Sequence, residues 1–152
     1  ERMSQSEEKN LRDQLKRADK TGTRAQLGNA LDHLAAHYHH KQKPSQALPL
    51  YRRSLVIWQE LLGPEHPTVA TLLLNLGSVY IELDDMTSAT PIYSKALSIF
   101  ESDGSLDNLS NLDSFESYLK VVQDKGQHRL FEQLEIRIRR LSQEFVHEQV
   151  YV

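Results

Sequence analysis

The stretches ALPLYRRSL, residues 47–55, and ATPIYSKAL, residues 89–97, share one pattern 42 residues apart. Pro49 of the first stretch returns as Pro91 of the second. The same spacing relates positions on either side, pairing Leu34 with Leu76, Ala35 with Gly77, Tyr38 with Tyr80, Tyr51 with Tyr93, Leu55 with Leu97 and Ile57 with Ile99. A period of this size indicates a stacked array of one supersecondary unit.

Each unit divides into two helices, because apolar residues recur at helical spacing and glycine and proline interrupt them. We expect the helices of the first unit to end before Lys43–Pro44 and at Gly63–Pro64, and those of the second to run from about Pro67 to Leu83 and Thr87 to Phe100. Pro44 suits the first position of a helix. Pro49 then lies near the helix start, where its missing donor causes only a mild bend.

Small residues occupy matching positions in the two units, at Ala35, Ala47 and Ser54 and again at Gly77, Ala89 and Ala96. They would let neighbouring helices approach closely, with the tyrosines filling the space beyond them. A bulky side chain at Ala47 or Ala89 would then overpack the core.

The pattern decays in a third unit, where the positions matching Ala35, Ala47 and Ser54 are Leu119, Phe131 and Ile138. Two helices are still expected, at about 109–123 and 127–147, and we interpret them as a capping hairpin, because an array needs an atypical terminal unit. Residues 4–19 form another amphipathic candidate. The sequence therefore predicts one all-α domain of about seven helices: a capping or truncated-repeat helix at 4–19, repeats at 23–62 and 66–103, a degenerate repeat at 108–147 and a tail at 148–152.

The composition excludes several classes of protein. With 18 Lys and Arg against 21 Asp and Glu, the net charge of −3 predicts no general attraction for nucleic acid or anionic lipid. The absence of cysteine excludes thiolate sites and fits a reducing compartment. No apolar run approaches the length of a membrane span. We expect an intracellular protein, cytoplasmic in the simplest case, although a targeting segment removed before Glu1 would allow an organelle lumen.

Chemistry-bearing clusters are few. His33, His37 and His40 share a helical stripe and are weak candidates for metal binding, but the stripe lacks the glutamate of H-E-x-x-H, so a solvated helix face is favoured and no metal is expected. Arg137, Arg139 and Arg140 form a short basic run that suits the negative end of a helix dipole. No catalytic motif or phosphate-binding loop is present, which predicts a non-enzymatic protein without cofactors.

The order Leu-small-x-x-Tyr, Ala, Tyr, small in residues 24–103 resembles the tetratricopeptide repeat. The 42-residue period, the linker LGPEHPTVA (62–70) and the block LLLNLGSVY (72–80) resemble the kinesin light chain subtype in particular. The resemblance implies an α-α superhelix of helical hairpins whose concave face, formed by the first helix of each repeat, binds a segment of another protein. Carried over by position, the binding residues are Asn29, Asp32, His33, Ala36 and His39, then Thr71, Leu74, Asn75, Ser78 and Ile81, then Asp113, Glu116, Ser117 and Lys120.

Asn75 matches the asparagine of this family that hydrogen-bonds a bound peptide backbone, while the equivalent positions hold His33 and Ser117. A groove lined by Asp32, Asp113 and Glu116 with apolar Leu74 and Ile81 should prefer a neutral or basic segment with apolar anchors. The leading hypothesis is thus an adaptor or scaffold. The alternative is a structural domain. It would either self-associate into a homo-oligomer or have its groove filled by one of its own helices, 4–19 or 127–147.

Overall fold

The computed structural model describes residues 2–104 and 109–150, and the side chains of residues 5–104 and 109–143. These residues form seven helices: α1 (Arg2–Thr21), α2 (Arg24–His40), α3 (Pro44–Leu62), α4 (Pro67–Glu82), α5 (Met86–Asp103), α6 (Leu109–Asp124) and α7 (His128–Val150). The all-α architecture is confirmed, and the helix bounds lie close to those expected. The expected tail, 148–152, lies partly within α7 and partly outside the described residues.

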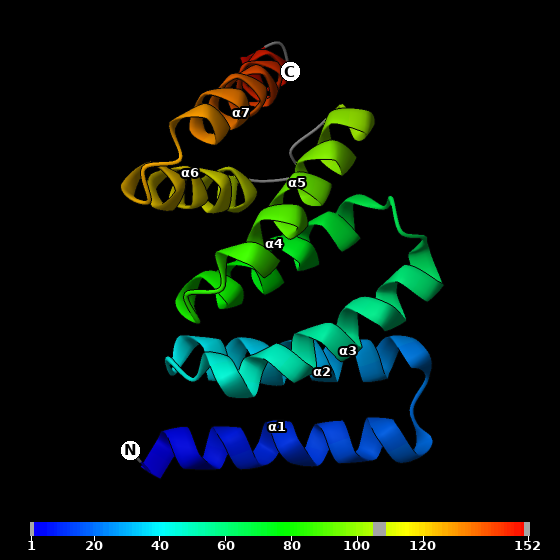
Figure 1. Ribbon diagram of the computed structural model, residues 1–152. Helices are drawn as coiled ribbons and strands as arrows, with labels where there is room; N and C mark the ends of the chain where they lie inside the picture. The colour runs from blue at the N-terminus through cyan, green and yellow to red at the C-terminus, as the bar shows by residue number, and fades with distance from the viewer. Residues whose placement is uncertain (1, 105–108, 151–152) are drawn as a thin grey trace.

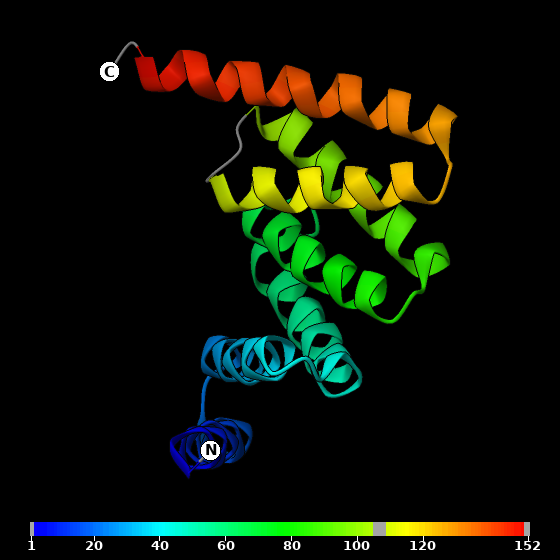
Figure 2. The same ribbon diagram turned by 90° about the vertical axis from the view of Figure 1, so that its left-hand side faces the viewer.

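The helices follow one another as antiparallel hairpins stacked along one direction, with α1 at one end of the stack and α7 at the other (Figure 1). The hairpins are α2–α3, α4–α5 and α6–α7, and the view turned by 90° shows α6 and α7 lying across the end of α4 and α5 (Figure 2). The molecule is therefore a superhelix of helical hairpins, as the repeat pattern predicts.

The turn inside each hairpin repeats through all three units. Gln42, Asp84 and Gly126 lie 42 residues apart, and all three adopt the left-handed conformation, with φ of 54°, 56° and 70°. In each turn the following amide donates to a carbonyl near the end of the first helix: Lys43 to Tyr38, Asp85 to Tyr80 and Gln127 to Val122. The third unit has thus kept the hairpin geometry although its packing residues have changed.

The small residues of the first two repeats lie where helices approach closely. Ala35, Ala47, Ala89 and Ala96 are fully buried. A Cβ atom added to Gly77 would lie 2.7 Å from Cε2 of Tyr93, so this site of α4 has no room even for a methyl group. Pro49 and Pro91 are each the sixth residue of their helix and are exposed to solvent, so water can reach the carbonyl groups that lack their usual donor.

One hydrophobic core runs from α2 to α7. Its junction between the second and third units is aromatic: the ring of Tyr93 stacks on Tyr118 with centroids 4.0 Å apart, and Phe115 contacts Phe100 edge-on. The Tyr118 hydroxyl donates to Thr90. Phe115, Tyr118 and Val122 anchor α6 here.

Cations on the second helix of each repeat connect it to the preceding unit. Arg53, Lys95 and Arg137 are spaced by 42 residues and pair with Asp19, Glu65 and Glu101 respectively. The basic run around Arg137 therefore lies in the middle of α7, not near a helix C-terminus, and its first member forms an ion pair with α5. Asp19 lies on α1, which packs beside α2 ahead of the first repeat.

No helix among the described residues combines the length and apolar character needed to cross a membrane.

Candidate protein-binding surface

The first helices of successive repeats lie next to one another. On one side of α4, His39 of α2 is 2.9 Å from Glu82 through its Nε2 atom. On the other side, the Asn111 amide of α6 donates to the Thr71 hydroxyl over 3.1 Å. These contacts bring the expected binding residues of α2, α4 and α6 onto adjacent helices. We call the exposed and half-buried members of that set the inner row.

Several polar side chains of the inner row make no hydrogen bond to another described residue. Asn75 is half-buried at the middle of the row, and its side-chain amide has no hydrogen bond to any described residue. Asn29 and His33 are exposed on α2, one helical turn apart. On α6, the exposed members are Asp113, Glu116, Ser117 and Lys120. An amide that both donates and accepts can bind a peptide main chain.

Two residues of the sequence-based set are engaged inside the protein, Leu74 by burial and the half-buried Asp32 by hydrogen bonds to α3. Leu74 is only 1% exposed and belongs to the core, so it offers no apolar anchor. Asp32 turns toward α3, where it accepts hydrogen bonds from the Ser54 hydroxyl and from Nε1 of Trp58 at 2.9 Å. Burial raises the pKa of Asp32 above its ordinary value, against the opposing effects of these two donors and of His33. Helical periodicity could not show this, because both partners lie on another helix.

The remaining predicted residues are partly accessible. Ala36, His39, Thr71, Ser78 and Ile81 are half-buried, and Ile81 packs against the core. Thr71, Ser78 and His39 already have hydrogen-bonding contacts within the protein, to Asn111, to the Asn75 carbonyl and to Glu82 respectively.

The histidine stripe divides into separate environments. His37 is 8% exposed and faces α1, with Nδ1 3.8 Å from a Glu7 carboxylate and Nε2 buried without a hydrogen bond. His33 and His40 are exposed. Within the described part of the chain, no three His, Cys, Asp or Glu side chains gather in a way that could hold a metal ion.

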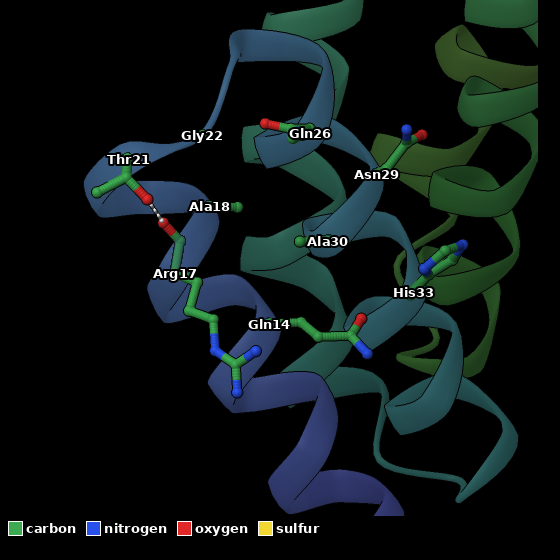
Figure 3. A pocket seen from close by; sticks show the side chains of 9 residues that line it. All are labelled: Gln14, Arg17, Ala18, Thr21, Gly22, Gln26, Asn29, Ala30 and His33. Carbon is green, nitrogen blue, oxygen red and sulfur yellow. Dashed lines mark hydrogen bonds between the residues drawn. The ribbon is translucent and has the colours of Figure 1, made fainter.

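A groove of about 520 Å³ between α1 and α2 was not predicted from the sequence. Small residues, Ala18, Gly22 and Ala30, line it together with a polar rim of Gln14, Arg17, Thr21, Gln26, Asn29 and His33. Figure 3 shows Gln14 pointing from α1 toward α2, with Asn29 and His33 beyond it on α2. The groove is therefore continuous with the α2 end of the inner row. The sequence feature that could have indicated this groove is the set of small residues, Ala18, Gly22 and Ala30, on and beside the two neighbouring helices.

Comparison with protein families gives a match over about half of the chain. The model of the tetratricopeptide repeat family matches residues 26–102, which span α2 to α5. The curated proteins contain no match to this chain.

Among solved structures, the crystal structure of BtubC (BKLC) from P. vanneervenii is similar in fold, with a TM-score of 0.72 at 22% sequence identity. The similarity covers 91% of this chain and 55% of that chain. The present chain thus corresponds to about half the length of that protein. At this identity the comparison concerns the fold alone, and it extends the match to nearly all of the array.

Proposed function

The chain belongs to the tetratricopeptide repeat family, whose members typically mediate protein–protein interactions without catalysing reactions, and from this premise we propose an adaptor or scaffold module that binds a segment of a partner protein along the inner row. The observation behind this proposal is Asn75. Its amide is half-buried on the central helix α4 and makes no hydrogen bond to another described residue. A group held in place without a partner can bind a peptide backbone without first breaking an internal contact.

The kinesin light chain-like character, the intracellular and in the simplest case cytoplasmic location, and the lack of nucleic-acid partners belong to the same proposal. The expected charge and apolar anchors of the partner change, because Leu74 is buried and the Asp32 carboxylate is already bound by Ser54 and Trp58. At the α6 end, Asp113 and Glu116 still favour a basic or neutral stretch of the partner. Ile81 is the remaining apolar group of the predicted set.

The alternative, a groove filled by one of the chain's own helices, receives less support from the packing. α1 lies against α2 at one end of the stack, and α7 packs on α6 and α5 at the other. Leu11, Leu15 and Ala18 of α1 are half-buried against the array, and Leu134, Ile138 and Leu141 of α7 are buried in it, so neither helix lies along the inner row. Sedimentation across a concentration series tests self-association directly, because a monomer at every concentration removes it.

The test of the proposal is affinity capture from native lysate with the 152-residue chain as bait, compared with Asn75→Ala. Gln133→Ala is the matched control, since it removes an exposed amide from the outer surface of α7. Circular dichroism must show that all three proteins are folded to the same extent.

We expect a protein that is enriched on the parent and on Gln133→Ala and reduced several-fold on Asn75→Ala. Equal recovery on all three baits would contradict binding along the inner row.

A further inference from the structure

The groove between α1 and α2 extends the inner row beyond the first repeat. We propose that this α1–α2 groove binds an acidic segment of the partner, with Arg17 pairing to a carboxylate. This proposal rests on the proposed function. It adds which end of the bound segment is acidic and in which direction the segment lies along the inner row. It differs from the expectation of a uniformly neutral or basic ligand.

The charge around the groove is the first support. Residues 9–24 hold six of the chain's 18 lysines and arginines but two of its 21 aspartates and glutamates. This segment is therefore strongly basic within a chain whose net charge is −3. A local potential of this sign attracts acidic groups although the whole protein does not.

The way these charges are paired is the second support. Asp19 pairs with Arg53, and Glu8 is bound by Arg12 and Tyr38. By contrast, the side chains of Lys16, Arg17 and Lys20 have no ion pair with any residue whose side chain the structure describes. Arg24 is already paired with Glu60, and Asp13 lies beside Lys16, Arg17 and Lys20, so three unpaired cations stand against one carboxylate on this side of α1.

The chemistry of the rim fits an extended peptide. A guanidinium presents a planar fork of donors that matches a carboxylate, so Arg17 can bind an acidic side chain through two hydrogen bonds. Gln14, Gln26 and Asn29 supply amides that can donate to and accept from the peptide backbone. Ala18, Gly22 and Ala30 have small side chains or none, so the main chain of a bound peptide could approach the two helices closely here. The lining includes no Phe, Tyr or Trp on which a nucleic-acid base could stack, which favours a peptide over single-stranded nucleic acid.

The two ends of the inner row then carry charges of opposite sign, and this difference sets the direction in which the partner segment binds. Arg17 and His33 lie at the α1–α2 end, whereas Asp113 and Glu116 are exposed on α6. Asp32, the acidic residue next to His33, is bound by Ser54 and Trp58 on the side of α3 and does not line the groove. A segment with acidic residues toward α1 and basic residues toward α6 fits both ends.

The experiment titrates fluorescein-labelled hexaglutamate into the full chain at low ionic strength and follows anisotropy, with hexaglutamine and hexalysine peptides as references. Arg17→Gln removes the proposed charge. Arg129→Gln is the matched control, because it makes the same charge change at an exposed site near the start of α7, at the other end of the array. Inorganic phosphate is tested as a competitor.

We expect hexaglutamate to bind more tightly than hexaglutamine, Arg17→Gln to weaken its binding about tenfold, as the loss of one charge-assisted pair implies, and Arg129→Gln to leave it within about twofold. Equal weakening by both variants, no preference over hexaglutamine, or complete displacement by an equal concentration of phosphate would each overturn the proposal. Such a result would leave Asn75-dependent capture untouched, so the two proposals fail separately.

Discussion

The α4–α5 and α6–α7 hairpins share one turn geometry but pack their two helices against each other in different ways. In α4–α5, Gly77, Ala89 and Ala96 let the helices approach until the ring of Tyr93 covers the glycine. The same register positions in α6–α7 hold the larger residues Leu119, Phe131 and Ile138. These two helices approach each other less closely, and a groove of about 290 Å³ lined by the three residues remains between them. The left-handed turn at residues 42, 84 and 126 is thus common to all three hairpins, whereas close packing follows the small residues, which the third hairpin lacks.

Phe115→Ala should have the largest effect, because this residue joins the two kinds of hairpin. Its ring is 1% exposed and contacts both Tyr93 and Phe100. Removing it should lower the free energy of unfolding by about 3–5 kcal/mol, the usual cost of a large cavity. Urea denaturation measures the loss. A cost below about 1 kcal/mol would mean that the third hairpin is not docked through this ring.

Gly77→Leu gives the α4–α5 hairpin the leucine that the α6–α7 hairpin has at the same register position, Leu119. The new side chain would meet Tyr93, which cannot move freely because it is stacked on Tyr118. We expect a loss of about 3 kcal/mol, at the upper end of overpacking costs, together with a change in the near-ultraviolet dichroism of the tyrosines.

The matched change is Leu119→Met, at the register position of Gly77. A swap between side chains of similar volume should cost less than about 1.5 kcal/mol. If Gly77→Leu were tolerated equally well, the distinction between the closely packed α4–α5 hairpin and the wider α6–α7 hairpin would be wrong.

Arg137→Gln should have a smaller effect than the changes in the core. Two hydrogen bonds from Arg137, at 2.8 and 2.7 Å, lower the pKa of Glu101, with burial acting in the opposite direction. A carboxyl group whose pKa is lower in the folded state stabilises the protein above its unfolded pKa and loses this contribution as the pH falls through the folded value. Water reaches the pair, so we expect a loss of about 0.5–1 kcal/mol at pH 7.

Urea denaturation at pH 7 and again at about pH 3, below the ordinary glutamate range, should show the difference between parent and Arg137→Gln shrink at the lower pH. Lys95→Gln breaks the more exposed ion pair with Glu65 and should cost less. A difference for Arg137→Gln that persists unchanged in acid would indicate lost packing and not a lost ion pair.

Much of the fold follows from periodicity, because the 42-residue spacing places each helix, its breakers and its small contact residues by analogy with another copy. Pro44 at a helix start and Gly77 beneath Tyr93 are examples. The third hairpin was also expected, although its packing residues depart from the pattern. In these cases the deciding information is local to one helix or one repeat.

The binding surface was less predictable, since it depends on contacts between helices that sequence spacing does not encode. Asp32 lies at an apparently inward position, but Trp58 and Ser54 of α3 bind it. Leu74 is at the equivalent register position in α4 and is buried. The α1–α2 groove exists because α1 docks beside α2. The 42-residue repeat pattern does not predict this docking, because α1 lies outside the two matching repeats.

The most direct test of the inner-row account is site-specific photo-crosslinking to the partner recovered by affinity capture. A crosslinking amino acid is placed at Asn75 on α4 in one protein and at Gln133 on α7 in another, and both are illuminated with the partner. The account predicts a covalent adduct from position 75 and none from position 133. An adduct from position 133 with none from position 75 would show that the array binds its partner through the outer surface, contradicting the account.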